Sequence, residues 1–314
     1  MSDTSMNNII STAETTSSGS VAQVADFWAL LKPGVMYLVV FTGFSGLMIA
    51  PGTIHPFLGC VALLCIAIAS GGAGAINMWY DRDIDAIMTR TKKRPIPAGR
   101  MAPDVALSFG VILSIFSVML MGLAVNWTAA ILLALANGFY VFVYTMFLKR
   151  RTPQNIVIGG AAGAFPPMVG WAAVTGTVSV ESIVLFLIIF MWTPPHFWAL
   201  ALYKDGDYAA AKIPMLPVVA GRKNTKWQML VYTVILLPLV LAPVYWGVAG
   251  MLYGGVALAA SLYFLYLNIC VLRSEEDKVA KKMFFFSIFY LFLLFAMLII
   301  DRAPGIMSLI GGEA

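Results

Sequence analysis

The sequence predicts an all-α membrane protein, a polytopic bundle of about nine transmembrane helices. Hydrophobic residues make up 61% of its 314 residues and charged residues only 11%, whereas soluble domains carry roughly 25% charged residues. The mean hydropathy is +0.87, and apolar stretches of the roughly 17–25 residues needed to cross a bilayer recur along the chain. These observations exclude a soluble globular domain.

Nine stretches have the length and composition of a membrane span. They are residues 33–50, 57–80, 105–125, 128–148, 155–175, 183–202, 227–249, 251–272 and 283–300. The first is the least clearly bounded, because Lys32-Pro33 either starts the span or belongs to an interfacial helix that begins near Phe27. The three cysteines lie inside such stretches without paired spacing, so we expect them to pack as small hydrophobic residues.

The two ends of the chain differ from the apolar middle. Residues 1–26 are rich in Ser, Thr and Asn and contain no Lys or Arg, so they lack the features of a signal or mitochondrial transit peptide. We predict a disordered cytoplasmic tail at 1–26, a membrane-embedded domain at 27–302 and a short external tail at 303–314, in a protein of the bacterial inner membrane.

Basic residues mark alternate connections between the spans. They occur in segments 82–100, 149–151, 204–226 and 273–282 and at Lys32, and of the 20 Lys and Arg residues only Arg302 falls on the other side. The positive-inside rule then predicts a cytoplasmic N-terminus and, with an odd number of spans, an external C-terminus. The net charge of +5 is therefore mainly a topological signal. We expect the lipid bilayer as a partner and no nucleic acid.

An ordered row of polar side chains ends the second span. Asn77, Asp81 and Asp85 are spaced four residues apart, which places them one turn apart on one face of a helix. Carboxylate and amide oxygens in this arrangement suit Mg²⁺, which takes few protein ligands and completes its shell with substrate phosphate oxygens.

A basic run follows these acids directly. It contains Arg90, Lys92, Lys93 and Arg94, whose ammonium and guanidinium groups suit phosphate oxygens. Acids, metal and basic groups at the end of an apolar helix predict a site for a hydrophobic diphosphate. The alternative is an ordinary loop made basic by the positive-inside rule, but that rule requires no ordered row of acids.

A second polar segment resembles the first. Residues Tyr203–Ala209 follow the sixth span much as Tyr80–Ala86 follow the second, on the same predicted side. This predicts an internal pseudo-repeat whose two acidic ends converge over a central cavity that opens to the cytoplasmic side. Asp207 would then lie opposite the first motif, with Asp205 as an additional candidate metal ligand. Chance similarity over seven residues is the alternative.

Small residues and prolines indicate close helix packing and broken helices. The glycines are Gly71, Gly72, Gly74, Gly159, Gly160 and Gly163, and Pro166-Pro167 and Pro194-Pro195 are expected to interrupt the fifth and sixth spans. Asn155, at the start of the fifth span, is either a cation or phosphate ligand or a helix-capping residue.

Four stretches, in order, resemble the UbiA-type intramembrane prenyltransferases, and in particular their heme-modifying branch. They are Asn77 through Asp85 continuing to Arg100, Tyr144 through Pro167, Pro195 through Trp198, and Asp207-Tyr208 leading to Pro217. Two positions depart from the pattern. Many relatives carry a second Asp-x₃-Asp motif, whereas Ala211 stands four residues after Asp207, and Lys212 stands where the branch often has glycine.

The resemblance implies an enzyme that transfers the farnesyl group of farnesyl diphosphate to heme b with addition of water, giving heme o and diphosphate. It implies Mg²⁺ as cofactor, held by Asn77, Asp81, Asp85 and Asp207. The diphosphate would be bound by Arg82, Arg90, Lys93, Arg94, Lys149 and Arg150, and Tyr80, Tyr144 or Tyr208 would stabilise the allylic cation. The resemblance also suggests a heme a synthase as a further partner.

His196 lies nine residues before Asp205, about 13 Å along a helix, and therefore inside the membrane. An ionisable residue at that depth is a functional candidate. It would ligate heme iron or donate a hydrogen bond to a heme propionate. The alternative is a histidine bonded to a neighbouring helix.

Other classes of membrane protein share some of these features. A secondary transporter would place its polar site near the midplane, whereas these acids lie at helix ends. A UbiA-type enzyme that acts on a quinone head group or chlorophyll is the closer alternative, and only the branch-specific stretches argue against it. A CDP-alcohol phosphotransferase would need an Asp-Gly and Ala-Arg pattern that the first motif lacks.

Overall fold

The computed structural model describes residues 22–302, and throughout this range the regular structure is helical. Residues 1–21 of the expected N-terminal tail, and the expected external tail at 303–314, lie outside the described residues. Helix α1 (Val24–Leu30) begins inside the range expected for the N-terminal tail. Helix α1 therefore extends across the expected boundary at 27.

The long helices match the nine expected spans closely. They are α2 (Pro33–Ile49), α3 (Pro56–Tyr80), α5 (Pro103–Ala124), α6 (Trp127–Gly138) continued by the π-helix η1 (Phe139–Leu148), α7 (Asn155–Ala164) with α8 (Pro166–Thr175), α9 (Val180–Leu202), α11 (Leu216–Tyr245), α12 (Met251–Arg273) and α13 (Asp277–Asp301). Among residues 22–302, eight helices are long and apolar enough to cross a membrane, and α1 with α2, bent by 54°, makes a ninth if counted as one span. The multi-pass membrane bundle is confirmed.

The seventh span differs most from expectation. Helix α11 begins at Leu216 rather than near 227, and it is kinked at Gly221, where φ is 79° and ψ is 160°. A side chain other than glycine rarely adopts this φ. The glycine therefore lets the chain turn from the polar connection into the membrane helix.

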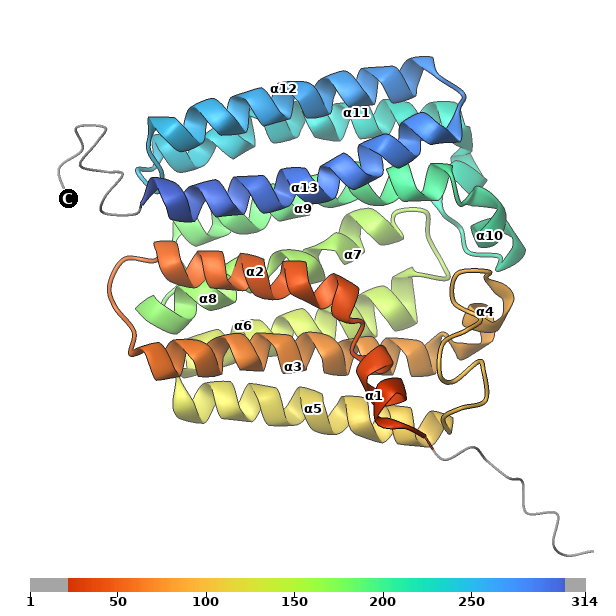
Figure 1. Cartoon of the computed structure of the whole chain (residues 1–314), viewed down its shortest axis with the longest axis horizontal. Helices are drawn as coiled ribbons and strands as arrows, with labels where there is room; N and C mark the ends of the chain where they lie inside the picture. The colour runs from red at the N-terminus through yellow and green to blue at the C-terminus, as the bar shows by residue number, and fades with distance from the viewer. Residues whose placement is uncertain (1–21, 303–314) are drawn as a thin grey trace, which may run out of the picture.

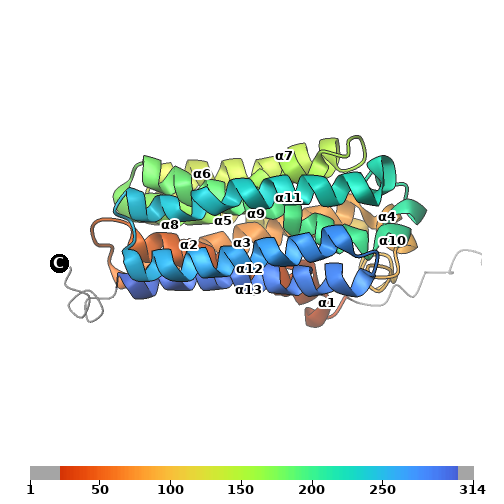
Figure 2. The same ribbon diagram turned by 90° about the horizontal axis from the view of Figure 1, so that it is seen from above.

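Both polar segments lie at the same end of the bundle (Figure 1). Each follows a long helix and forms a six-residue helix, α4 (Arg82–Ile87) after α3 and α10 (Asp205–Ala210) after α9. Their apolar side chains join one buried cluster that includes Ile84 and Tyr208. The view from above in Figure 2 also shows α4 and α10 at the same end of the bundle. The two segments therefore share their local architecture as well as their place in the fold.

Glycines let two pairs of helices approach to backbone contact. A Cβ at Gly170 of α8 would lie 2.0 Å from Gly43 O of α2, and one at Gly46 would lie 2.1 Å from Pro167 O. Gly72 of α3 meets α5 in the same way. By contrast, a Cβ at Gly163 would meet nothing within 4 Å. Most of the expected small-residue contacts are present, because small side chains are what allow membrane helices to pack this closely.

The two proline pairs act differently. Pro166-Pro167 separate α7 from α8, as expected. Pro194-Pro195 lie inside a continuous α9, so the expected interruption of that span is wrong. The fixed φ of proline is compatible with helix, and the Thr193 hydroxyl donates to Ile189 O at 2.8 Å within the same turns. Contacts with α11, α13 and α7 hold this helix in the bundle.

The opposite end of the bundle is closed by the end of α13. The Asp301 carboxylate accepts a hydrogen bond from Gly250 N at the start of α12. The Arg302 guanidinium donates to the carbonyl oxygens of Gly247 and Val248 at 2.9 and 3.0 Å, and to Ile49 O at the end of α2 at 3.3 Å. One helix terminus thus satisfies backbone groups of three other segments.

Candidate active site

The three polar side chains of the first motif are buried at the end of α3. Asn77 lies in its last turn, Asp81 is the C-terminal cap and Asp85 lies in α4, with exposed fractions of 3%, 0% and 2%. The chain bends at Asp81, yet Asp81 N donates to Asn77 O at 2.9 Å and Asp85 N to Asp81 O at 2.8 Å. The expected one-turn spacing therefore survives, although the helix is not continuous. The Asn77 amide also donates to Asp81 Oδ2 at 2.8 Å.

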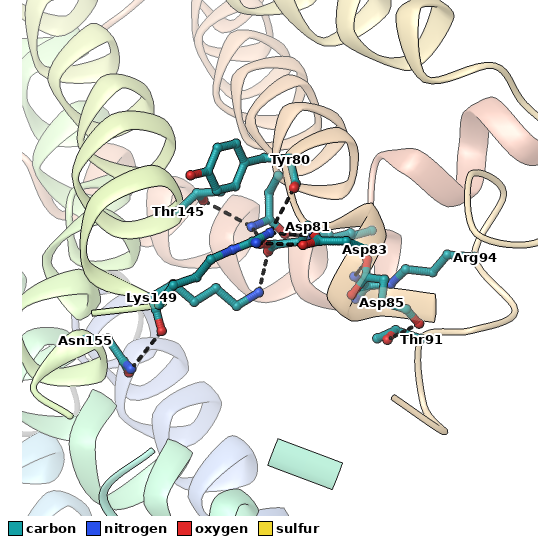
Figure 3. A network of polar contacts seen from close by, with 12 residues as sticks. Tyr80, Asp81, Asp83, Asp85, Thr91, Arg94, Thr145, Lys149 and Asn155 are labelled. Atoms are coloured by element: carbon teal, nitrogen blue, oxygen red, sulfur yellow. Dashed lines mark hydrogen bonds and ion pairs between the residues drawn. The ribbon is translucent and has the colours of Figure 1, made fainter. Parts of the chain in front are cut away.

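Cationic side chains neutralise these carboxylates (Figure 3). Lys149 Nζ donates to Asp81 Oδ2, and Arg150 Nη2 lies 3.4 Å from Asp81 Oδ1. Arg94 Nη1 donates to Asp85 Oδ2 at 2.5 Å. Buried carboxylates are tolerated only when they are paired in this way. The structure thus brings three of the candidate diphosphate-binding residues, Arg94, Lys149 and Arg150, to the acids.

Arg150 also fixes the start of α4. Its two terminal nitrogens donate to Asp83 Oδ1 and Oδ2, each at 2.7 Å, and its guanidinium lies 4.9 Å from the centroid of the Tyr80 ring. The hydrogen bonds from Arg150 lower the pKa of the Asp83 carboxyl. This fork holds the segment between Asp81 and Asp85 in place.

The π-helix η1 positions Lys149 and Thr145. Its wide turns continue to Lys149, whose N–H donates to Tyr144 O at 2.9 Å. Thr145 Oγ1 accepts from Asn77 Nδ2 at 3.1 Å. Gly159 makes room for the Tyr144 ring, because a Cβ there would lie 2.2 Å from Tyr144 Cδ2. π-helices often occur at functional sites, but nothing in the sequence signalled this one, so Thr145 was missed.

Lys32 is a second residue that the sequence reasoning missed. It was counted only as a topological charge, yet its ammonium donates to Asn77 Oδ1 at 2.5 Å. The sequence feature that could have indicated this role is the Lys-Pro pair at the start of the first span. A long side chain at that position can reach the end of a neighbouring helix.

The remaining basic candidates lie outside this cluster. Arg82 packs over the Trp79 ring at 5.6 Å and donates to Trp79 O at 2.8 Å. Arg90 and Lys93 are exposed. Within residues 22–302 none of these three side chains forms an ion pair with an acid.

The second polar segment presents its two acids differently. Asp205 pairs with Arg222 at 2.8 Å, and Arg222 also pairs with Asp277 of α13 at 2.6 Å. Asp205 therefore belongs to a network that ties α10 to α11 and α13. Asp207 is half-buried in the first turn of α10. No three His, Cys, Asp or Glu side chains in the described part of the chain lie close enough to hold one metal ion.

His196 is enclosed by protein. Its ring stacks between Trp192 and Phe284, with centroids 4.3 and 4.7 Å away. Its Nδ1 hydrogen-bonds with Ser287 Oγ of α13 at 2.6 Å. Both faces of the imidazole are therefore covered, and the geometry matches a histidine bonded to a neighbouring helix.

Asn155 lies directly beside Lys149. It is 1% exposed, and its Nδ2 donates to Lys149 O at 3.4 Å, whereas its Oδ1 has no hydrogen-bond partner. The residue before it, Gln154, takes the N-cap position of α7. Asn155 therefore supports the backbone that carries Lys149, and its free oxygen is consistent with a ligand role.

Comparison with known proteins identifies the family. The model of the UbiA prenyltransferase family matches residues 38–294. This chain belongs to the UbiA prenyltransferase family. It is 56% identical over its whole length to a protoheme IX farnesyltransferase of Parvibaculum lavamentivorans, covering 98% of that protein. It is 58% identical to one of Rhizobium johnstonii, over 93% of this chain and 94% of the relative.

Solved structures of UbiA proteins share the fold. A digeranylgeranylglyceryl phosphate synthase matches with a TM-score of 0.73 at 18% identity, over 88% of this chain and 97% of the other. A UbiA homologue from Archaeoglobus fulgidus, bound to GPP and Mg²⁺, matches with a TM-score of 0.64 at 16% identity, over 87% and 99% of the two chains. At this identity the likeness shows the fold alone.

The donor set of this UbiA chain fits a magnesium ion. One amide and two carboxylate oxygens lie at a single helix end, and no sulfur or imidazole ligand is among them. Mg²⁺ is usually bound by one or two carboxylates together with substrate phosphate oxygens, so a third protein carboxylate is not required. The surrounding cations provide donors for those phosphates.

Proposed function

We propose that this chain is a protoheme IX farnesyltransferase. It transfers the farnesyl group of farnesyl diphosphate to a vinyl group of heme b, with addition of water, and releases heme o and diphosphate. The main support for a diphosphate substrate is the buried row of Asn77, Asp81 and Asp85, whose carboxylates are neutralised by cations from other segments. The match of 56–58% identity to relatives of that name supports the heme half.

The diphosphate would bind at the end of α3. Asn77, Asp81 and Asp85 would hold Mg²⁺, with Asp207 on the opposite side, and the metal supplies Lewis-acid neutralisation of the leaving group. Arg94, Lys149 and Arg150 would donate hydrogen bonds to the remaining oxygens, where charge develops as the bond breaks. Arg82, Arg90 and Lys93 would help to attract the anion from solution.

The reaction then follows from charge separation. The allylic C–O bond breaks and its electron pair leaves with the diphosphate, while the farnesyl carbon becomes cationic. The π electrons of the heme vinyl group form the new C–C bond, and water adds to the resulting cation and loses a proton, leaving a hydroxyl group. The Tyr144 ring, held against Gly159 beside the acids, would stabilise the farnesyl cation.

The cellular setting follows from the charge distribution. The ends of α3 and α9 carry the basic connections, and the C-terminal end of α13, which Arg302 caps, lies at the other end of the bundle (Figure 1). This supports an inner-membrane enzyme with a cytoplasmic diphosphate site and a cytoplasmic N-terminus. A heme a synthase remains an expected partner.

The decisive experiment analyses the porphyrin product. Purified protein supplied with farnesyl diphosphate, heme b and Mg²⁺ should give a heme whose mass increases by one farnesyl group and one hydroxyl group. In ¹⁸O-labelled water the new hydroxyl should carry the label. Unchanged heme, together with prenylation of an aromatic acid supplied in parallel, would contradict the heme assignment and keep only the prenyltransferase class.

A further inference from the structure

Lys32 lies at the bend between α1 and α2 in an unusual backbone conformation. Its φ of 53° and ψ of 57° fall in the left-handed region, which residues other than glycine rarely adopt. Pro33 disfavours the right-handed helical conformation for the residue before it, so the two helices meet at 54°. Glycine would make this bend without strain, so a lysine here indicates a use for its side chain.

That side chain enters the candidate active site. Its aliphatic part passes Gly74, where a Cβ would lie 3.5 Å from Lys32 Cδ. Its ammonium donates to Asn77 Oδ1 at 2.5 Å and lies 5.9 Å from the centroid of the Tyr140 ring. The charged groups that face it are Asp81, Asp85, Arg94 and Lys149. Lys32 therefore belongs to the same charge cluster as the acids.

The hydrogen bonds of Asn77 fix which of its atoms meets Lys32. The amide nitrogen donates to Asp81 Oδ2 at 2.8 Å and to Thr145 Oγ1 at 3.1 Å. Only Oδ1 has lone pairs with which to ligate a metal ion, and Lys32 occupies it. Two cations on one buried oxygen repel each other strongly, so the ammonium and a bound metal compete for this atom.

We propose that Lys32 holds the Asn77 oxygen in the substrate-free enzyme and moves to an oxygen of the diphosphate when metal and substrate bind. Lys32 is then a diphosphate-binding residue that also prevents metal from binding without substrate. This inference rests on the proposed function.

The charge balance supports the exchange. Four cationic side chains, Lys32, Arg94, Lys149 and Arg150, surround the three carboxylates of Asp81, Asp83 and Asp85. The cluster therefore has positive charge to spare for an added anion. A diphosphate held at the metal offers the nearest new acceptor for a displaced ammonium on a flexible four-carbon stem.

The test measures two affinities in the full-length protein. Mn²⁺ alone is titrated as a paramagnetic probe, and farnesyl thiodiphosphate is titrated in the presence of Mg²⁺. Lys32→Gly removes the ammonium and suits the left-handed bend, Lys32→Met keeps most of the stem, and Lys32→Arg keeps the charge. Lys278→Met, at an exposed lysine in the first turn of α13, is the matched control.

The two affinities should change in opposite directions. Lys32→Gly and Lys32→Met should bind Mn²⁺ alone several-fold more tightly, because the competing cation is gone. The same variants should bind the analogue about tenfold or more weakly, as expected for one lost charge-assisted hydrogen bond. Lys32→Arg should bind the analogue nearly as well as wild type, and Lys278→Met should change neither affinity.

Other outcomes would overturn the inference. A parallel loss of both affinities with a lowered unfolding temperature would make Lys32 a purely structural residue. Unchanged affinities in both neutral variants, while the wild type binds the analogue and forms heme o, would reject Lys32 and leave the proposed function intact. A wild-type protein that binds no analogue in a metal-dependent way would reject both.

Discussion

At the scale of single residues, the site consists of buried acids whose cationic partners come from the loop that follows them and from a distant part of the chain. Asp81 is paired with Lys149 and Asp85 with Arg94. Without these cations each buried carboxylate would cost several kcal/mol. Ammonium and guanidinium groups are also what a diphosphate requires. The side chains that stabilise the buried acids are therefore of the kind that the proposed diphosphate site needs.

The sequence revealed the acids but only part of their surroundings. A four-residue repeat of Asn and Asp is visible in one segment, because the helical period sets it. Which cations meet those acids depends on tertiary packing: Lys149 follows Asp81 by 68 positions and Lys32 precedes Asn77 by 45. Arg82 and Asp205 lie in the expected segments, yet they bond to Trp79 and Arg222.

Removing one charge from the motif should separate ligand acids from surface acids. Asp81→Asn should lower heme o formation by about a hundredfold or more, because it removes a charged ligand of the metal. Asp83→Asn, at an acid that is largely exposed, should keep most of the activity. Turnover is compared at equal protein accumulation. Equal turnover in the two variants, or full activity in EDTA, would contradict the magnesium site.

His196→Ala tests whether this histidine packs or binds heme. The substitution removes two ring stacks and the bond to Ser287, so it should lower the free energy of unfolding by about 1–3 kcal/mol. The heme Soret band should stay in place. His196→Phe should recover part of the lost stability by restoring the stacks. A shifted Soret band at unchanged stability would instead identify His196 as an iron ligand.

At the scale of elements, one of the two helix breaks expected at proline pairs is present, and one helix type was missed. Proline pairs and glycines are visible in the sequence, and the break between α7 and α8 falls at Phe165, directly before Pro166. The π-helix η1 was not predictable, because its apolar residues fit an α-helix equally well. The π-helix packs against α7 and α3, and a local sequence pattern does not contain such tertiary contacts.

Backbone contact between α2 and α8 predicts a sharp difference between two glycines. Gly170→Ala places a Cβ against the Gly43 carbonyl, so it should lower the free energy of unfolding by about 1–3 kcal/mol or more. Gly163→Ala meets nothing within 4 Å and should be neutral or stabilising by up to about 1 kcal/mol. Thermal unfolding in detergent compares them. Equal unfolding midpoints for the two variants would mean that α2 and α8 move apart at little cost.

At the scale of the whole molecule, the arrangement of spans was predictable because lipid imposes it. Every backbone polar group in the bilayer core must be bonded internally, so long apolar stretches become helices. The contact between the two polar segments was inferred from shared sidedness, and α4 and α10 do share a buried cluster. The lateral order of the helices was not readable, since lipid-facing and protein-facing surfaces are both apolar.

The predicted orientation can be measured by labelling from outside. After the three native cysteines are replaced by serine, a cysteine at Thr177 should react with a membrane-impermeant maleimide in spheroplasts. A cysteine at Lys92 should react only after lysis, because its segment carries the basic residues. Both positions are exposed. The reverse pattern would place the candidate active site on the outer side.

The cap formed by Asp301 and Arg302 has a consequence for biogenesis. Carbonyls at the end of α2 and after α11, and the amide of Gly250 at the N-cap of α12, are bonded by these two residues at the end of α13. During synthesis the end of α2 therefore lacks this partner until the end of α13 has been made. The ribosome makes this part of the bundle last, so until then quality-control proteases meet a protein that is unfinished at the end opposite the candidate active site.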